Sequence, residues 1–300
     1  MAAASSRKFT PRVRAAAARS KPAAKAKASA PVSKAKTVSK AKTDVKSKTV
    51  AKTKTVKPAS KPQPVVKPPK PIEFHYWPTP NGAKVAVMLE ECGLPYEARP
   101  VNIGRGEQFT PEFLKLSPNN RIPAILDPEG PNGKPISIFE SGAILQYLGR
   151  KTGKFYPADE RARVEVDEWL FWQMAGLGPM AGQAHHFRQF APETIPYAIE
   201  RYTNEVGRLY AVMNRRLTGR DYLTGKYSIA DMACYTWIVP HQTQGQNLGN
   251  FPALKAWFER VGARPGVQRG MAVGKDLRAP PADLRSSQDA RRALFGQRPR

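Results

Sequence analysis

The segment from Asn119 to Gly142 constrains the fold of this chain most. It holds two short apolar runs, 122–126 and 136–139, separated by a turn, and this pattern predicts a β-hairpin. Proline cannot donate a hydrogen bond to a sheet ladder, so Pro123 marks the entrance of the first strand, and Ile122–Pro123 is a candidate cis bond.

The far end of this hairpin carries a second chemical feature. Glu140 and Ser141 stand where the second strand ends, and Ser141 is expected to cap a helix over residues 141–150. Free backbone N–H groups and a hydroxyl would then face one point that suits a carboxylate. The two ends together predict a site for an extended peptide, paired with the backbone before Pro123 and with its terminal carboxylate on the helix end.

The segments around the hairpin predict an α/β domain. A strand over 73–77 is followed by a helix whose apolar residues are spaced by three and four and which Gly93 ends. A second strand is expected over 96–103 and a short helix over 110–116. Cys92 falls on the apolar face of the first helix, so we interpret it as a buried small hydrophobe and not as a reactive thiol.

From Arg161 onward the pattern is helical. A stripe of apolar residues predicts a long helix over 195–217, and Ser228 and Asp231 form a capping box that opens another helix. The glycine-rich stretch 176–187 is expected to interrupt the helices and loop over the site. Residues 284–295 carry a short helical pattern that either docks over a cleft or a partner subunit, or is disordered.

Six stretches carry a resemblance to a known family. They are Thr79-Pro80-Asn81-Gly82, Gly106-Glu107-Gln108-Phe109, Ser117-Pro118-Asn119-Asn120, Phe139-Glu140-Ser141-Gly142-Ala143-Ile144-Leu145, Trp169-Leu170-Phe171-Trp172-Gln173 and Gly176-Leu177-Gly178-Pro179-Met180. The order of elements resembles the thioredoxin-like glutathione-binding domain of glutathione transferases. Over about residues 72 to 275 the chain is similar to the bacterial nu class, whose members are glutathione-dependent disulfide-bond reductases.

The expected organisation has four parts. A disordered Lys/Ala/Pro-rich basic tail over 1–71 precedes a thioredoxin-like α/β glutathione-binding domain over 72–154. An all-helical C-terminal domain over 160–275 and a C-terminal extension over 276–300 follow. The resemblance also implies a homodimer.

The turn before the first helix decides the kind of chemistry. Thioredoxin-like folds place a reactive sulfur there, at a positive helix end that lowers a thiol's pKa, yet this turn holds no cysteine. The resemblance transfers the contact with the glutathione thiol to Thr79 and Asn81 as the catalytic pair. The alternative is that these two residues only form a turn and a helix cap.

The resemblance implies the other ligand contacts as well. Gln108 should bind the glycine end of glutathione, Glu140 and Ser141 the γ-glutamyl end, and the cysteinyl backbone should lie between Arg121, Ile122 and the adjoining Pro123. In a dimer, Arg201 would reach the ligand of the neighbouring subunit. The second-substrate pocket is expected to include Trp172, His186 and Phe187, although Trp172 fits equally well in the core. Adjacent His185 and His186 are poorly spaced as metal ligands, so no metal is expected.

The positive charge is concentrated at the start of the chain. Of 49 Lys and Arg residues, 20 lie in residues 1–70 with Asp44 as the only acid there, so this segment carries +19 of the net charge of +25. Such a segment attracts polyanions, which predicts salt-sensitive, non-specific contact with DNA. The alternatives are a solubilising extension and, from the Arg-, Ser- and Ala-rich residues 1–20, an organelle transit peptide.

Cysteine usage and hydropathy favour a cytoplasmic protein, with nucleoid association through the tail as an additional possibility. Only Cys92 and Cys234 are present, without CxxC spacing, which is typical of a reducing compartment. Neither a secretory signal nor a membrane-spanning apolar run is expected.

The predicted function is a glutathione-dependent thiol–disulfide oxidoreductase in which glutathione, as cosubstrate, supplies the attacking thiolate. One alternative is conjugation of glutathione to electrophiles by the same thiolate. The other is a non-catalytic module tethered to nucleic acid by its tail, which the full set of predicted ligand contacts disfavours.

Overall fold

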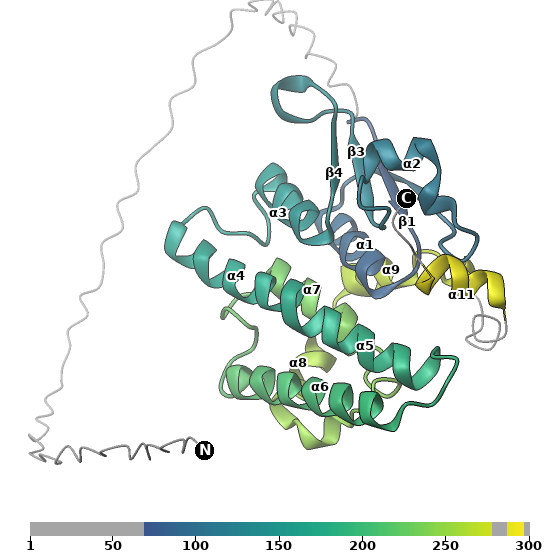
Figure 1. The fold of residues 1–300 in the computed structure, drawn as a ribbon. Helices are drawn as coiled ribbons and strands as arrows, with labels where there is room; N and C mark the ends of the chain where they lie inside the picture. Colours follow the sequence, from purple (N-terminus) through teal and green to yellow (C-terminus); the bar gives the residue numbers. More distant parts are fainter. Residues whose placement is uncertain (1–68, 278–286, 297–300) are drawn as a thin grey trace, which may run out of the picture. The chain divides into compact units, whose positions relative to one another are not determined.

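The computed structural model describes residues 69–277 and 287–296 (Figure 1). The predicted basic tail lies outside the described residues except for its last three positions, and so does the start of the helical pattern predicted over 284–295. The described residues begin just before the first strand.

A four-stranded sheet organises the first part, in the order β2-β1-β3-β4. Its strands are β1 (Ile72–Tyr76), β2 (Tyr96–Pro100), β3 (Ala124–Asp127) and β4 (Ile136–Phe139). β1 is parallel to β2 and antiparallel to β3, and β3 and β4 form the predicted hairpin. The second strand ends earlier than the predicted residue 103, because its partner β1 ends at Tyr76, which pairs with Pro100.

Helices cover both faces of this sheet. Neighbouring residues of β3 point to opposite faces: Ala124 joins a small cluster with Phe113, whereas Ile125 belongs to the main core. The helical segments are α1 (Pro80–Cys92), α2 (Pro111–Leu116) and α3 (Ser141–Thr152), with short 3-10 turns at Glu107–Phe109 (η1) and Pro131–Gly133 (η2). This architecture confirms the predicted thioredoxin-like α/β fold, and the Ile122–Pro123 bond is cis as predicted.

The start of α1 is fixed by its local sequence. Thr79 is the N-cap, its Oγ1 accepts a hydrogen bond from the Gly82 N–H at 3.3 Å, and Pro80 fills the first helical position. Only glycine fits at position 82, because an added Cβ would lie 2.2 Å from the Trp77 carbonyl oxygen. The helix ends at Gly93, as predicted, with φ of 68°.

The second part is helical, as predicted. Within the described residues after 160, the only β pairing is an isolated bridge between Thr224 and Lys226. The elements are α4 (Glu160–Trp172), a π-helix η3 (Gln173–Leu177), α5 (Gly178–Gln189), α6 (Pro196–Leu217), α7 (Ile229–Ile238), η4 (Leu248–Asn250), α8 (Pro252–Gly262), α9 (Pro265–Ala272) and η5 (Lys275–Leu277). The long helix over 195–217 and the capping box of Ser228 with Asp231 are both confirmed.

The glycine-rich stretch 176–187 does not form the predicted loop. It continues the helix as η3 and α5, because its glycines serve close packing. A Cβ at Gly178 would lie 2.7 Å from the Gln173 side-chain nitrogen, and one at Gly182 would lie 3.3 Å from the Trp237 ring. In the described part of the chain, no helix is both long and apolar enough to cross a membrane.

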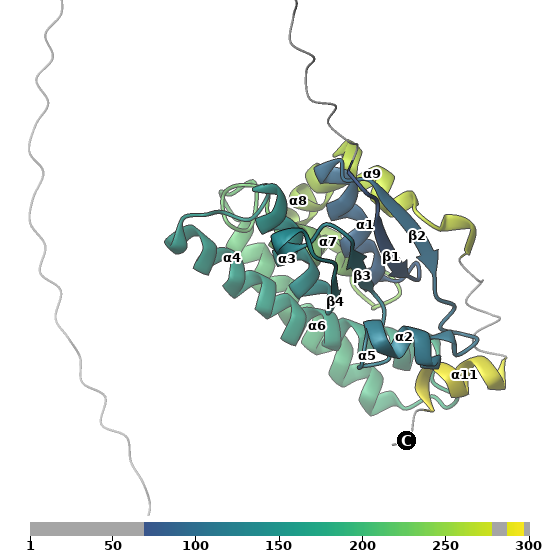
Figure 2. The same ribbon diagram turned by 90° about the horizontal axis from the view of Figure 1, so that it is seen from above.

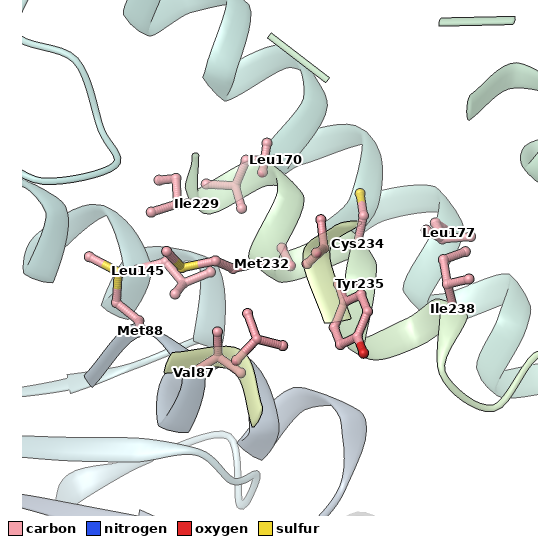
Figure 3. Close-up of a cluster of buried hydrophobic side chains, with 14 of the residues drawn as sticks. Val87, Met88, Leu145, Leu170, Leu177, Ile229, Met232, Cys234, Tyr235 and Ile238 are labelled. Atoms are coloured by element: carbon pink, nitrogen blue, oxygen red, sulfur yellow. The ribbon is translucent and has the colours of Figure 1, made fainter. Parts of the chain in front are cut away.

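One hydrophobic core joins the two parts, and α7 lies at its centre (Figure 3). Ile229 and Met232 of α7 lie in one buried cluster with Val87 and Met88 of α1 and Leu145 of α3, and α1 contacts α7. α1 also packs against α9. The start of α1, the start of α3 and the π-helix η3 are therefore held in fixed relation to one another.

A buried cation lies at this junction. Lys84 of α1 is 1% exposed, and its Nζ donates to Gln173 Oε1 at 2.7 Å and approaches Ser141 Oγ at 3.4 Å. The structure records no ion pair for Lys84 with any described carboxylate. Burial is the main cause that lowers the pKa of Lys84 to about 7, and the nearby Cys234 and Glu140 oppose it.

We expect Lys84 to make stability rise with pH above neutrality. Below pH 7 the amine is charged in the folded and the unfolded chain, so the cost of burying the charge is fully present. Between about 7 and the ordinary value of 10.5 the unfolded chain binds a proton that the folded chain does not. The free energy of unfolding of the native chain relative to Lys84→Met should therefore increase by up to about 1.4 kcal/mol per pH unit in that window.

Denaturant unfolding at several pH values between about 6 and about 9 would measure this difference. The matched control is Lys115→Met, at an exposed position of α2 where folding removes no charge from water. A difference between native protein and Lys84→Met that stays constant across the range would contradict the prediction.

Candidate functional site

A cavity of about 220 Å³ lies where α1, α3, η3 and the entrance of β3 meet. Six of the residues predicted from the sequence line it, and Ser117 and Met174 complete its wall. The lining is Asn81, Ser117, Arg121, Ile122, Pro123, Glu140, Ser141 and Met174. The structure thus brings the two ends of the hairpin and the start of α1 around one space.

The start of α3 differs in detail from the prediction. Glu140, not Ser141, is the N-cap residue, with φ of 68° and no side-chain cap hydrogen bond, and Ser141 is the first helical residue. Ser141 Oγ is buried and lies 3.7 Å from Met174 Sδ and 3.4 Å from Lys84 Nζ. The predicted capping by Ser141 is wrong because the left-handed backbone of Glu140 starts the helix one residue earlier, which leaves backbone N–H groups as donors.

The charged side chains of the cavity have opposite signs. The Arg121 and Glu140 side chains are both exposed at its rim, and Glu140 Oε1 accepts a hydrogen bond from Asn119 Nδ2 at 3.4 Å. A left-handed φ is uncommon for a non-glycine residue and is often found at ligand-binding sites. A cation, an anion and a helix N-terminus around one space suit a zwitterionic ligand with a second carboxylate.

Thr79 and Asn81 are the residues predicted to contact a thiol. The hydroxyl of Thr79 accepts the capping hydrogen bond from Gly82, so its own hydrogen remains available to a ligand. Asn81 lines the cavity, and its Oδ1 accepts a hydrogen bond from Trp237 Nε1 at 2.8 Å. Thr79 therefore caps the helix, as the alternative interpretation expected, and its hydroxyl hydrogen can still donate to a ligand.

No protein thiol lies at the cavity. Cys92 and Cys234 are both free and buried, and Cys92 is 8% exposed on the apolar side of α1 as predicted. Burial raises the pKa of both thiols, which keeps them protonated at neutral pH. Any sulfur chemistry at this site must come from a bound thiol.

Gln108 is covered by the C-terminal helix α11 (Gln288–Phe295). Its side chain is 2% exposed, with Nε2 at 3.3 Å from the Ile103 carbonyl oxygen and 3.5 Å from that of Ala293. α11 lies beside the end of α5 (Figure 2), where Phe295 contacts the rings of His186 and Phe190. Of the alternatives for the C-terminal extension, the structure shows this segment docked on its own chain.

The residues predicted for a second-substrate pocket fall in two places. His186 lies on α5, where the Phe295 ring of α11 is 4.5 Å away, and burial lowers its pKa. Phe187 stacks on Tyr202 at 5.5 Å. Trp172 packs edge-to-face on Trp169 at 5.3 Å and joins the core. His186 lies against α11 and the neighbouring Phe187 against α6, whereas Trp172 lies at the end of α4.

Arg201 does not join the other predicted residues. It lines a separate cavity of about 670 Å³ on α5 and α6, together with Tyr197, Glu205 and Arg208. Its predicted contact is with the ligand of a neighbouring subunit, so the role of Arg201 stays a prediction. Among the described residues, no group of three His, Cys, Asp or Glu side chains is arranged to hold a metal ion.

Sequence reasoning missed several residues at the site. Lys84 is a single cation inside an apolar helical run, and that contrast was a usable signal. Met174 and Gln173 come to the site through the π-helix, a feature often found at functional sites and without a sequence signature of its own. Trp237 reaches Asn81 from a position 156 residues away, so only the tertiary structure reveals it.

Comparison with known proteins agrees with this geometry. The chain matches the glutathione S-transferase N-terminal domain over residues 72–150 and the C-terminal domain over residues 179–265. It is 50% identical over 202 residues to the disulfide-bond oxidoreductase YfcG of Escherichia coli. The matched stretch covers 67% of this chain and 94% of that protein.

Two solved structures are similar throughout both parts. One is a glutathione transferase from Burkholderia graminis with two glutathione molecules bound per subunit (TM-score 0.65, 43% identity, 68% of this chain and 89% of that one). The other is a glutathione transferase from Pseudomonas putida with one glutathione disulfide bound per subunit (TM-score 0.66, 42% identity, 70% of this chain and 94% of that one). The chain belongs to the glutathione S-transferase family.

Proposed function

We propose that this protein is a glutathione-dependent disulfide oxidoreductase of the nu class. The observation that carries the proposal is the cavity itself, where donors and charges for a peptide with two carboxylates and one ammonium converge at a helix start that holds no protein thiol. The similarity to a disulfide-bond oxidoreductase and to structures with bound glutathione or its disulfide supports it.

The reaction is a double thiol–disulfide exchange. The thiolate of bound glutathione attacks one sulfur of a disulfide, a mixed disulfide forms, and the other half leaves as a thiolate that takes a proton from water. A second glutathione thiolate then attacks the glutathione sulfur of the mixed disulfide, which releases the second thiol and glutathione disulfide. The protein supplies position and a thiol pKa near neutrality.

Each predicted residue has a part in this scheme. Thr79 and Asn81 donate to the thiolate at the positive end of α1. Glu140 holds the γ-glutamyl ammonium, and the backbone at Ser141 holds its carboxylate. The cysteinyl backbone binds to Arg121, Ile122 and Pro123. Gln108 binds the glycine end once its contact with α11 is released. His186 and Phe187 face the second substrate, and Trp172 supports that region from the core.

The proposal also covers the assembly and the cellular context. We place the enzyme in the cytoplasm as a homodimer in which Arg201 reaches the partner's ligand. The proposed domains remain 72–154 and 160–275, with the basic tail over 1–71 as a non-specific DNA contact and 276–300 as an extension. The competing interpretation is that the tail is inert or directs the protein to an organelle.

Conjugation of glutathione to electrophiles is the second candidate, because family membership and the same activated thiolate favour it. A side-by-side assay separates the two: glutathione with a small disulfide, and glutathione with an aryl halide. Faster turnover of the aryl halide than of any disulfide tried would favour the transferase, and no turnover of either would indicate a binding module.

Removal of both cysteines should leave disulfide reduction nearly intact, because the attacking sulfur belongs to glutathione. The test is the reductase activity of the Cys92→Ala, Cys234→Ala variant with its fold checked by circular dichroism. A loss greater than about tenfold in a folded variant would contradict the mechanism.

Substitutions at the sulfur and at the remote end of glutathione should have different kinetic effects. Thr79→Ala and Asn81→Ala should lower kcat about tenfold or more, because each removes a donor to an ionised sulfur. Glu140→Ala should chiefly weaken glutathione binding. If all three variants change affinity alone and the pKa of bound glutathione does not move, the roles of Thr79 and Asn81 are wrong.

The tail and the enzyme should be separable, because residues 1–70 lack the apolar periodicity needed to dock on the folded part. A chain beginning at Pro71 should keep its fold and glutathione chemistry but lose duplex DNA binding. Mobility shifts at about 50 mM and about 200 mM salt would compare it with the full chain, whose affinity should fall steeply and not depend on sequence. Equal DNA binding by both chains would exclude the tail as the anchor.

A further inference from the structure

The amide of Asn81 must be oriented correctly to serve a thiolate. An asparagine side chain carries an acceptor oxygen on one side and a donor NH2 on the other, and only the NH2 side stabilises a negatively charged sulfur. Nothing in the local turn around Asn81 selects this orientation, because the capping hydrogen bond there involves Thr79 and Gly82. The selection must come from another part of the chain.

Trp237 of α7 sets the orientation of the Asn81 amide. Its indole Nε1 lies 2.8 Å from Asn81 Oδ1, across the junction between the α/β and the helical parts. An indole N–H is a donor only, so its partner must be the amide oxygen, and the NH2 of Asn81 is turned to another side. Among the described residues no protein acceptor is recorded for that NH2, and Asn81 lines the cavity.

Trp237 is itself held at two places, its backbone carbonyl and its indole ring. Its carbonyl oxygen accepts a hydrogen bond from Gln244 Nε2 at 2.9 Å, and the buried Gln244 is fixed in turn by the Tyr210 hydroxyl at 2.8 Å. The indole packs on α5, where a Cβ at Gly182 would lie 3.3 Å from the ring. The ring therefore has little freedom to release Asn81.

We propose that Trp237 is a positioning residue whose indole N–H orients the Asn81 amide so that its NH2 group donates to the sulfur of bound glutathione. This inference rests on the proposed function. Trp237 touches neither the sulfur nor the substrate in this scheme, and it acts through Asn81 alone. It also makes the activity of the thioredoxin-like part depend on the helical part.

The test is Trp237→Phe, which keeps an aromatic ring and removes only the N–H. The ionisation of bound glutathione is followed by thiolate ultraviolet absorbance against pH, alongside kcat and KM for a small disulfide. We expect the pKa of the bound thiol to rise and kcat at neutral pH to fall about threefold to tenfold, the effect of one hydrogen bond, with little change in KM for glutathione.

Two comparisons separate positioning from general packing. Trp257→Phe removes another indole N–H, the one that donates to buried Asp231 at 2.8 Å, and should lower thermal stability without changing the pKa of bound glutathione. In an Asn81→Ala background, Trp237→Phe should have no further effect on that pKa, because its only route of action is gone.

The possible outcomes are distinguishable. If the native protein binds no glutathione, or binds it without lowering its thiol pKa, the proposed function fails. If the native protein ionises the thiol and Trp237→Phe does so equally well, the inference about Trp237 fails alone. It fails also if Trp257→Phe shifts the pKa equally, or if the effect of Trp237→Phe persists without Asn81.

Discussion

The apolar contact of α7 with α1 is the interaction on which the rest of this structure depends. Ile229 and Met232 of α7 share with Val87 and Met88 of α1 a buried core that runs through both parts of the chain. Truncating one such side chain typically costs about 2–5 kcal/mol, so the contact is strong enough to fix α1 in space. The positive end of α1, where a thiol would be stabilised, is placed by this packing.

The polar groups at the junction depend on that core for their geometry. Lys84 and Gln173 bond to each other out of water, and Trp237 bonds to Asn81, each pair joining an element of the first part to one of the second. In a region of low dielectric such bonds are strong, and a misplaced partner is costly. The site is consequently shared by both parts, although most of the cavity lining comes from the α/β part.

The C-terminal helix α11 adds a second connection between the two parts. It contacts Gln108 of η1 and His186 of α5, so one short helix covers two residues predicted to contact ligands. Gln108 keeps an unpaired buried Oε1, whereas the Arg121 and Glu140 side chains stay exposed. The described residues therefore leave the cavity open at the hairpin and Gln108 covered by α11.

The sequence by itself determined the local features. Thr79 to Gly82 fix the start of α1, Pro123 stands directly before β3, and the apolar spacing defines α6, because turn chemistry and periodicity act between near neighbours. Only the tertiary structure decided that the glycines after 176 pack as helix, that Glu140 takes the cap from Ser141, and that Trp237 contacts Asn81. Those outcomes depend on contacts between residues far apart in the chain, which no local pattern encodes.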